Sequence, residues 1–316
     1  MKKTLHLALA GSLVLFLGVG ALWAYAGAYG LHVLIRNGGA YWLPLSATST
    51  RLSPAMRLAL ADAPTAIAGT FEWRTIGQGF DVADLPVLAN GEAVDHILLA
   101  RIDSARFRFT VRNAPAGDKD LDQWMAQLRP ALVVNGSYYS LHGEPDTPVL
   151  SEGRLLGPKD YNAKAGAFVA SSSFAGIREL AELDWRTALQ GADNAMVSFP
   201  LLVADGRSRV RRASQWLANR SFIGQDTAGR IVIGTTADAF FSLDRLARFL
   251  LDAPLDLTLA LNLDGGPVAC QGISLNGYER KTYGRWEAQV EGDRVQLLTW
   301  PYGTPEMPVV LAVFPK

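Results

Sequence analysis

The sequence predicts an α+β protein whose core is a largely antiparallel or mixed β-sheet with a few packing helices, preceded by one N-terminal transmembrane helix. Three observations support this fold class. Short apolar and β-branched runs dominate the chain from Gly69 onward, two helix-then-strand units interrupt them, and an uncharged apolar stretch lies at the N-terminus. Short strands joined by glycine-containing turns are typical of antiparallel sheets.

The composition excludes several classes of protein. The chain has 316 residues, of which 49% are hydrophobic and 19% charged, so it is too apolar for a disordered protein and too charged for a polytopic membrane protein. Its 30 basic residues balance 30 acidic ones, and we expect no nucleic-acid partner because no net charge attracts a polyanion. The single cysteine, Cys270, excludes an intrachain disulfide and a cysteine-based zinc site.

Residues 1–36 have the features of a membrane anchor. Lys2 and Lys3 precede residues 4–35, which contain no Asp, Glu, Lys or Arg, and Arg36 follows them. About 20 apolar residues cross a bilayer, whereas the apolar region of a cleaved signal peptide has about 7–15. We therefore expect an uncleaved signal-anchor. The alternatives are a signal peptide cut after the small-x-small site at residues 24–26 and a buried core helix.

The charges that flank this segment predict its orientation. The two lysines before it favour a cytoplasmic N-terminus. We therefore expect a single-pass protein of the inner (cytoplasmic) membrane whose remaining chain lies on the periplasmic or extracellular side. If the signal is cleaved, the protein is exported and soluble. The expected partners are the membrane, through the N-terminal helix, and envelope or extracellular molecules.

The rest of the chain divides into a linker and one domain. Residues 37–68 contain several prolines and a Ser/Thr cluster, and we interpret them as a linker with one short helix from Pro54 to Ala61. Residues 69–316 contain no comparable break and are predicted to form one domain.

Turn signals predict three β-hairpins in this domain. The first joins His96 to Ile102 with Phe107 to Arg112 around the turn at residues 103–105. The second joins residues 199–204 with residues 208–210 through Asp205-Gly206. The third joins residues 222–225 with residues 230–234 through a turn that contains Gly229.

Two helix-then-strand units share one design. Leu121, Trp124, Met125 and Leu128 have the spacing of one helix face, and a buried strand from Ala131 to Val134 follows. In the second unit, Ser242 is a candidate N-cap. The helix face of that unit consists of Leu243, Leu246, Ala247 and Leu250, and its strand runs from Leu257 to Leu263.

Polar residues begin where each of these strands ends. Period-two alternation places the leucines at 257, 259, 261 and 263 on one face and Asn262 with Asp264 on the other. Gly265 and Gly266 allow a close backbone approach and offer N–H groups to an anion. Asn135 and Ser137 likewise share a face at the end of the first strand. We infer that both strand ends line one pocket.

Several of these segments together resemble the phosphodiester glycosidase domain family. The most specific match is Leu261-Asn262-Leu263-Asp264-Gly265-Gly266, which is similar to the family's Asn-Leu-Asp-Gly-Gly signature. The segments that are also similar are residues 71–79, 97–103, 133–139 (Val-Val-Asn-Gly-Ser-Tyr-Tyr), 199–206 (Phe-Pro-Leu-Leu-Val-Ala-Asp-Gly), 220–224 (Arg-Ser-Phe-Ile-Gly) and 308–313. Their order covers roughly residues 70–316. Two departures lie near the proposed site: Pro267 follows the two glycines and removes an N–H donor, and Ser137 replaces a second glycine.

The resemblance implies a hydrolase that cleaves a sugar-1-phosphodiester or related glycosyl bond in an envelope or extracellular glycan. Such a reaction needs a cation for the phosphate and a carboxylate for the oxocarbenium-like transition state. Asp264 is the candidate carboxylate and Arg220 the candidate phosphate ligand, because a guanidinium is a permanent, bidentate donor. The alternatives are a non-catalytic glycan- or phosphate-binding module and a metal-dependent phosphodiesterase.

The remaining site residues are assigned around these two. Asn135 is placed with the catalytic residues, and Ser137 and Asn262 are expected to fix sugar hydroxyl groups, with Gly265 and Gly266 assisting the anion. Tyr138 and Tyr139 are candidates for stacking on a sugar ring or for the core.

A second carboxylate is needed, and Glu144, Asp146 and Glu152 are the candidates, of which Glu152 is retained as substrate-binding. We expect no cofactor and no metal, since no clustered histidine spacing accompanies His142. Cys270 is interpreted as a buried apolar residue. The arginines at positions 207, 209, 211 and 212 are interpreted as a solvated sheet edge.

Overall fold

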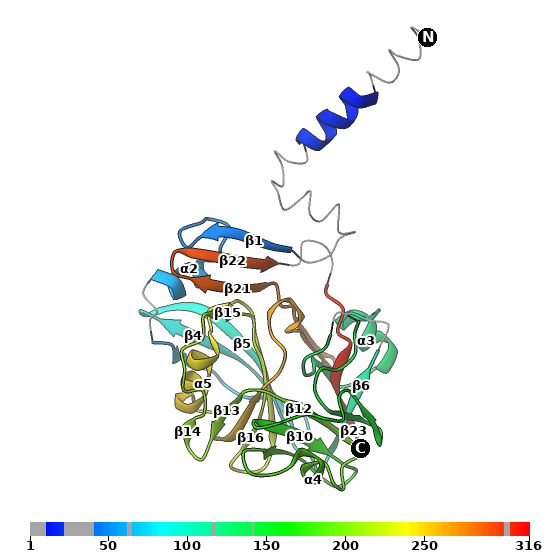
Figure 1. The fold of residues 1–316 in the computed structure, drawn as a ribbon. Coiled ribbons are helices and arrows are strands. Elements are labelled where there is room, and N and C mark those ends of the chain that lie inside the picture. Colours follow the sequence, from blue (N-terminus) through cyan, green and yellow to red (C-terminus); the bar gives the residue numbers. More distant parts are fainter. Residues whose placement is uncertain (1–10, 22–40, 62–64, 115–117, 141, 300–303) are drawn as a thin grey trace, which may run out of the picture.

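The computed structural model of the chain describes residues 11–21, 41–61, 65–114, 118–140, 142–299 and 304–316 (Figure 1). Residues 11–21 are helical and their side chains are exposed. Among the described residues no helix has both the length and the hydropathy needed to cross a membrane. The rest of the predicted anchor, residues 1–10 and 22–36, lies outside the described residues, so the anchor and its orientation stay predictions.

The described strands form four sheets whose pairings are all antiparallel, which confirms the predicted β-rich α+β class. The nine-stranded sheet is the largest. Its strands are, in spatial order, β14 (Arg207–Ser208), β13 (Leu201–Ala204), β18 (Leu257–Asn262), β16 (Ser221–Asp226), β17 (Ile231–Thr236), β5 (Glu92–Ile102), β4 (Phe80–Ala89) and β2 (Ile67–Ala68), with β3 (Arg74–Gly77) paired to β4.

Three smaller sheets surround it. One five-stranded sheet has the order β20 (Tyr278–Thr282), β19 (Gln271–Leu275), β7 (Leu132–Asn135), β23 (Val309–Pro315) and β6 (Phe107–Asn113). The other five-stranded sheet has the order β11 (Ala175–Glu179), β10 (Gly166–Ala170), β12 (Asn194–Ser198), β8 (Val149–Ser151) and β9 (Arg154–Leu156). The four-stranded sheet has the order β1 (Tyr41–Ser46), β22 (Arg294–Thr299), β21 (Trp286–Glu291) and β15 (Trp216–Ala218).

Apart from the exposed helix of residues 11–21, the described helices pack on the outside of these sheets. They are α2 (Pro54–Ala61), α3 (Leu121–Leu128), α4 (Trp185–Ala188) and α5 (Leu243–Asp252), with one 3₁₀ turn, η1 (Gly266–Val268). Asp120 caps α3, and its side chain and that of Gln123 form a reciprocal capping box. Ser242 occupies the predicted N-cap of α5, but its hydroxyl donates to Asp244 at 2.8 Å and no side-chain cap bond forms. The predicted extent of α2 is confirmed, and the predicted face residues of the other two helices lie on α3 and α5.

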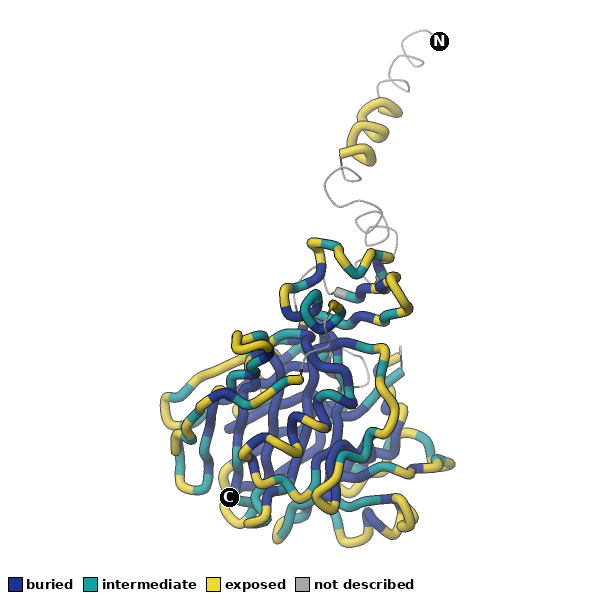
Figure 2. The backbone as a smooth tube through the Cα atoms, turned by 90° about the vertical axis from the view of Figure 1, so that its left-hand side faces the viewer, coloured by how far each residue is buried: buried dark blue, intermediate teal, exposed yellow. Residues whose placement is uncertain are grey.

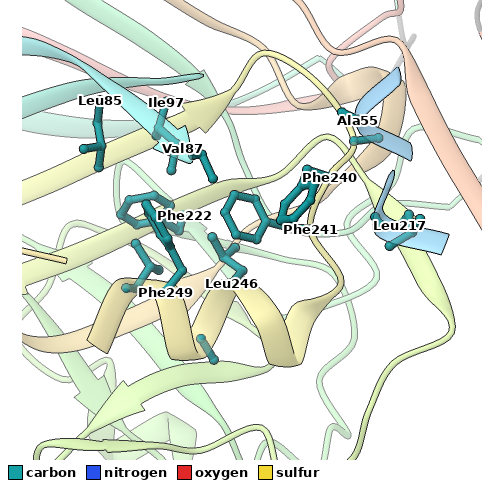
Figure 3. Close-up of a cluster of buried hydrophobic side chains, with 14 of the residues drawn as sticks. Ala55, Leu85, Val87, Ile97, Leu217, Phe222, Phe240, Phe241, Leu246 and Phe249 are labelled. Carbon is teal, nitrogen blue, oxygen red and sulfur yellow. The ribbon is translucent and has the colours of Figure 1, made fainter. Parts of the chain in front are cut away.

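Both faces of the nine-stranded sheet are buried. Figure 2 shows that many strands in the body of the molecule consist of buried residues. On one face, Phe222 of β16 packs against Leu246 and Phe249 of α5, with Phe240 and Phe241 beside them (Figure 3). The four-stranded sheet and α2 contribute to the same cluster. The opposite face packs against the two five-stranded sheets. Because apolar surface on both sides is removed from water, this sheet is a rigid support for the residues at its strand ends.

The predicted hairpin between residues 96–102 and 107–112 is wrong, although both strands exist. The turn forms, with the N–H of Phe107 donating to the carbonyl of Asp103 at 3.0 Å. However, β5 pairs with β4 and β17, whereas β6 pairs with β23 in another sheet. Since a strand has only two edges, β5 has no edge left for β6. The hairpins β13–β14 and β16–β17 are confirmed.

The segment predicted as a linker, residues 37–68, packs on the domain over much of its length. Strand β1 pairs with β22, and β2 pairs with β4. Leu52, Ala55, Met56 and Ala59 are buried in the cluster beneath α2. Prolines and small residues suggested a tether, but the apolar face of α2 is covered by tertiary contacts that its composition alone does not indicate. Residues 37–40 and 62–64 lie outside the described residues.

The strand β18 departs in one detail from the predicted alternation. Leu259, Leu261 and Leu263 pack with the cluster between the large sheet and the five-stranded sheets, but Leu257 packs with the cluster on the opposite face. The pairing of β16 with β18 shifts register between Gln225 and Asp226. This irregularity interrupts the period of two, so the first leucine faces the other way.

Candidate active site

The ends of β7 and β18 meet although they belong to different sheets. The N–H of Asp264 donates to the carbonyl of Gly136 at 3.0 Å, and Asn135 Nδ2 donates to the carbonyl of Asp264 at 2.8 Å. Both strands end at this point, so polar side chains replace the leucines and valines of the core. The predicted convergence of the two strand ends is thus a feature of the structure.

Asp264 is a half-buried carboxylate with few hydrogen-bond donors. Its Oδ1 accepts a hydrogen bond from the N–H of Gly265 at 2.8 Å. Burial raises the pKa of Asp264 to about 7, and the neighbouring carboxylate of Glu287 acts in the same direction, while Arg220 opposes them. A carboxyl group with this pKa changes its protonation state near neutral pH, which is a property of acids and bases in catalysis.

Arg220 lies beside Asp264, between β15 and β16. A Cβ placed on Gly265 would lie 3.2 Å from Arg220 Nη1, so the guanidinium packs against the Asp264-Gly265 backbone. Its Nη2 donates to the carbonyl of Trp216 at 2.8 Å and its Nε to the carbonyl of Phe241 at 3.3 Å. The fork that we expected to bind phosphate therefore already donates to two carbonyls, and Nη1 is the terminal nitrogen turned toward the Gly265 backbone.

The prediction that Gly265 and Gly266 offer free N–H groups to an anion is wrong for this conformation. The N–H of Gly265 donates to the Asp264 carboxylate at 2.8 Å. The N–H of Gly266 donates to the carbonyl of Asn219 at 2.9 Å. Glycine is needed at position 266 for two other reasons. Its φ of 73° favours glycine, and the side chain of Glu287 packs directly against its Cα.

Glu287, on β21, is the acid that sequence reasoning missed. A Cβ on Gly266 would lie 2.7 Å from Glu287 Oε2, which places this carboxylate next to the glycine pair. Burial raises the pKa of Glu287, and Arg220 lowers it. Glu287 belongs to no recognisable sequence motif. It lies on a strand that is C-terminal to the Asp-Gly-Gly segment at residues 264–266.

Asn262 and Tyr138 form a polar network beside the strand ends. Asn262 Nδ2 donates to Tyr138 Oη at 2.8 Å and to the carbonyl of Phe199 at 3.1 Å. Tyr138 Oη donates to the same carbonyl at 2.8 Å, and its ring stacks on the ring of Phe199 with centroids 4.4 Å apart. Burial and the charge of Asp264 raise the pKa of Tyr138. The Tyr138 ring thus has an aromatic partner within the protein.

Two buried amide oxygens in this region have no hydrogen-bond partner among the described residues. They are Oδ1 of Asn135 and Oδ1 of Asn262. Ser137 is only 1% exposed, and its hydroxyl accepts from Thr147 Oγ1 at 3.0 Å. The hydroxyl of Ser137 is therefore engaged inside the protein, whereas the two asparagine oxygens retain acceptor capacity.

The second carboxylates considered from the sequence lie in different places. Glu152 is in the turn between β8 and β9 and forms an ion pair with Arg112. Asp146 is closer to the strand ends, because its N–H donates to the carbonyl of Tyr138 at 2.9 Å and its charge contributes to the raised pKa of Asp264. A cavity of about 740 Å³ is lined by Asn113, Glu144, Pro145, Asp146, Ser151, Arg154, Leu156, Gly157 and Pro158.

Cys270 and the acidic groups do not form another reactive centre among the described residues. Cys270 is buried in the cluster under α3, and burial raises the pKa of its thiol to about 12, which disfavours a thiolate nucleophile. Within the described ranges, no group of three or more His, Cys, Asp or Glu side chains is arranged to hold a metal ion. Arg207 lies on β14, at the edge of the nine-stranded sheet as expected, and Arg209 just beyond it pairs with Glu179 and Asp205.

Comparisons with known proteins show what the chain resembles. Solved structures that resemble the chain include the zebrafish N-acetylglucosamine-1-phosphodiester alpha-N-acetylglucosaminidase catalytic domain auto-inhibited by its pro-peptide (14% identity, 89% of this chain, 91% of that chain, TM-score 0.49). Others are a hypothetical protein from Synechocystis (13%, 73% and 64%, 0.46) and a putative exported protein from Burkholderia pseudomallei K96243 (10%, 88% and 100%, 0.47). No curated protein sequence matches the chain. Residues 129–270 match the phosphodiester glycosidase family model, which confirms the family resemblance over that segment, from the end of α3 to the residue before β19.

Proposed function

We propose that the chain is a hydrolase that cleaves a sugar-1-phosphodiester or related glycosyl bond in an envelope or extracellular glycan. The observation that carries this proposal is Asp264, a half-buried carboxylate with a pKa raised to about 7, at the meeting point of two strands. The following residue, Gly265, packs against the Arg220 guanidinium. The family match of residues 129–270 supports the same class of reaction.

The chemistry of such a substrate explains why these two groups suffice to begin the reaction. When the C1–O bond breaks, the phosphate departs as a monoester, and positive charge develops at C1. Arg220 places a permanent positive charge near the departing phosphate. Ionised Asp264 stabilises the sugar cation or removes the proton of an attacking water. Both interactions strengthen as charge develops, which lowers the barrier.

The neighbouring polar groups support substrate binding in this proposal. The Oδ1 atoms of Asn135 and Asn262 lack a partner among the described residues but are buried, so they accept from a sugar hydroxyl only after the site opens. Asp146 connects the site with the cavity of about 740 Å³, whose size suits further units of a glycan.

A direct test uses the full chain in detergent and a panel of methyl phosphodiesters of sugar-1-phosphates in H₂¹⁸O. We expect release of free sugar that carries ¹⁸O, unaffected by a chelator. Label in the phosphate together with chelator-sensitive turnover would instead identify a metal-dependent phosphodiesterase. Saturable binding without turnover across the panel would identify a glycan- or phosphate-binding module, and either result would overturn the proposal.

The proposed substrates require that the domain faces away from the cytoplasm. We infer this orientation from the paired lysines that precede the apolar N-terminal segment. Protease added to intact spheroplasts should then digest the C-terminal domain. Protection until the membrane is permeabilised would contradict this location.

A further inference from the structure

We propose that Glu287 is the second carboxylate of this site and donates a proton to the phosphate oxygen that leaves. This proposal rests on the proposed function, because it assigns a residue to that reaction. It starts from the position of the Glu287 carboxylate, which is half-buried against Gly266 and accepts no hydrogen bond from another described residue. A carboxylate so placed is available to a substrate.

The contact with Gly266 fixes the distance between Glu287 and the Asp-Gly-Gly segment. A Cβ at this glycine would lie 2.7 Å from Glu287 Oε2 and 3.1 Å from Glu287 Cβ, so any side chain there would displace the acid. The φ of 73° independently favours glycine. The glycine therefore gives Glu287 access to the loop that carries Asp264.

The strand of Glu287 is held in register on both sides. Glu287 pairs with Ala218 of β15 and with Leu298 of β22. The outer edge of β22 is in turn covered by β1, the strand from the segment that was expected to be a linker. A residue in the middle of a sheet has little backbone freedom, so the carboxylate is presented at a defined position.

One buried asparagine joins the elements of the site. Asn219 Oδ1 accepts from the N–H groups of Arg285 and Trp286 at 2.9 and 3.0 Å. The carbonyl of Asn219 accepts from Gly266 at 2.9 Å, and Asn219 directly precedes Arg220. The start of the Glu287 strand, the glycine loop and the guanidinium are thus fixed relative to one another.

The charges that face Glu287 give it and Asp264 different states. The groups are the Arg220 guanidinium, the Asp264 carboxylate and the Tyr138 hydroxyl. Two carboxylates that interact at close range do not both ionise readily, so the pair shares a proton near neutral pH. Arg220 interacts more strongly with Glu287 than with Asp264 and lowers the pKa of Glu287, so the shared proton rests mainly on Asp264. The minority arrangement, with the proton on Glu287 and Asp264 ionised, is the one that reacts.

The reaction balances with these two acids. Ionised Asp264 takes a proton from water as the water oxygen bonds to C1. The C1–O bond breaks and its electron pair goes to the phosphate oxygen, which receives the proton of Glu287. The products are free sugar and a phosphate monoester, with Asp264 protonated and Glu287 ionised. Proton exchange with solvent restores both groups.

Glu287→Gln in the full chain tests this role, with Glu291→Gln as the matched control. Glu291 lies on the same strand and is exposed. We expect kcat/KM of Glu287→Gln to fall by about 10²–10⁴-fold, the usual contribution of a general acid. The decline of kcat/KM at high pH, which reports loss of the acid's proton, should also disappear. Equal activity of the two variants would overturn the proposal while leaving the proposed function intact.

A second readout does not depend on turnover. The Asp264 carboxyl signal, followed by ¹³C NMR during a pH titration, should titrate at lower pH in Glu287→Gln, because a like charge has been removed. An unchanged midpoint would place Glu287 outside the site and overturn the proposal. Inactivity of the wild-type chain on every phosphodiester would instead overturn the proposed function, and with it the role of Glu287 in it.

Gly266→Ala provides a third variant, with Gly229→Ala as its control. Both glycines have positive φ, 73° and 79°, so the backbone strain is similar, but the nearest atom to a Cβ at Gly229 is 4.0 Å away. Displacement of Glu287 should lower kcat/KM of Gly266→Ala by about tenfold or more, equivalent to roughly 1.4 kcal/mol of transition-state stabilisation. Equal kcat/KM in both folded variants would contradict the contact.

Discussion

Asp95 and Asp264 are both carboxyl groups whose pKa is raised by burial, but they differ in exposure and in hydrogen-bond partners. Oδ1 of Asp95 accepts hydrogen bonds from the N–H groups of His96, Ala237 and Asp238 at 2.7, 3.1 and 2.8 Å, and the residue is 3% exposed. Burial raises its pKa well above the ordinary value. Asp264 is more exposed and accepts from one backbone N–H.

The difference between these two sites separates a structural carboxyl group from a reactive one. At Asp95, backbone donors converge on one oxygen and join β5 to the loop after β17. At Asp264, an arginine and a second carboxylate surround the acid, and solvent reaches it. A raised pKa alone therefore does not identify a catalytic group, whereas few donors, charged neighbours and access together do.

The largest expected difference lies in the activity of paired amide variants. Asp264→Asn should lower kcat/KM by about 10²–10⁴-fold, because the amide neither takes a proton nor carries negative charge. Asp95→Asn keeps an acceptor oxygen for the three N–H groups and should leave kcat/KM within roughly twofold. Steady-state kinetics of both full-length variants makes the comparison. Parental activity of Asp264→Asn would remove this residue from the mechanism.

A smaller loss is expected when the cation next to Asp264 is changed. Arg220→Lys keeps the charge but loses the fixed fork that donates to the carbonyls of Trp216 and Phe241. Charge-assisted hydrogen bonds contribute about 1.5–3 kcal/mol, so kcat/KM should fall by about 10–150-fold. Arg230→Lys, which alters an ion pair with Asp226 in the β16–β17 turn, is the control. Equal effects would argue against a role of Arg220 in phosphate binding.

Substitutions at the same two sites should change stability in opposite directions above about pH 7. The pKa of Asp264 rises from its ordinary value of 3.8 to about 7 on folding, so stability is lost as pH rises through this interval. Asp264→Asn should therefore raise the free energy of unfolding above about pH 7, by on the order of a few kcal/mol, and have little effect below about pH 4.

Asp95→Ala should instead be destabilising at every pH. It leaves buried N–H groups without an acceptor, at a cost of about 1–3 kcal/mol for each group. Urea denaturation at pH 4 and pH 8 measures both variants. A destabilised Asp264→Asn at the higher pH would show that this carboxylate supports the fold in the way that Asp95 does.

Local patterns in the sequence were sufficient for several elements. The spacing of Leu121, Trp124 and Leu128 predicted α3, and the Asp205-Gly206 turn predicted the β13–β14 hairpin. These predictions succeeded because each depends on residues that are close together in the chain. The hairpin predicted around Asp103 failed, since the turn forms locally but the partner of each strand is chosen by distant strands.

By itself, the sequence determined the apolar runs that become buried strands and the polar residues that end them, so it placed Asn135 and Asp264 at strand ends. Only the tertiary structure decided which groups surround Asp264. The hydrogen bonds of Asn219 bring β21 and Glu287 to the glycine loop, and the same contacts occupy the N–H of Gly266. The physical reason is that charge and hydrogen-bond neighbours depend on packing between distant segments, which periodicity along the chain does not encode.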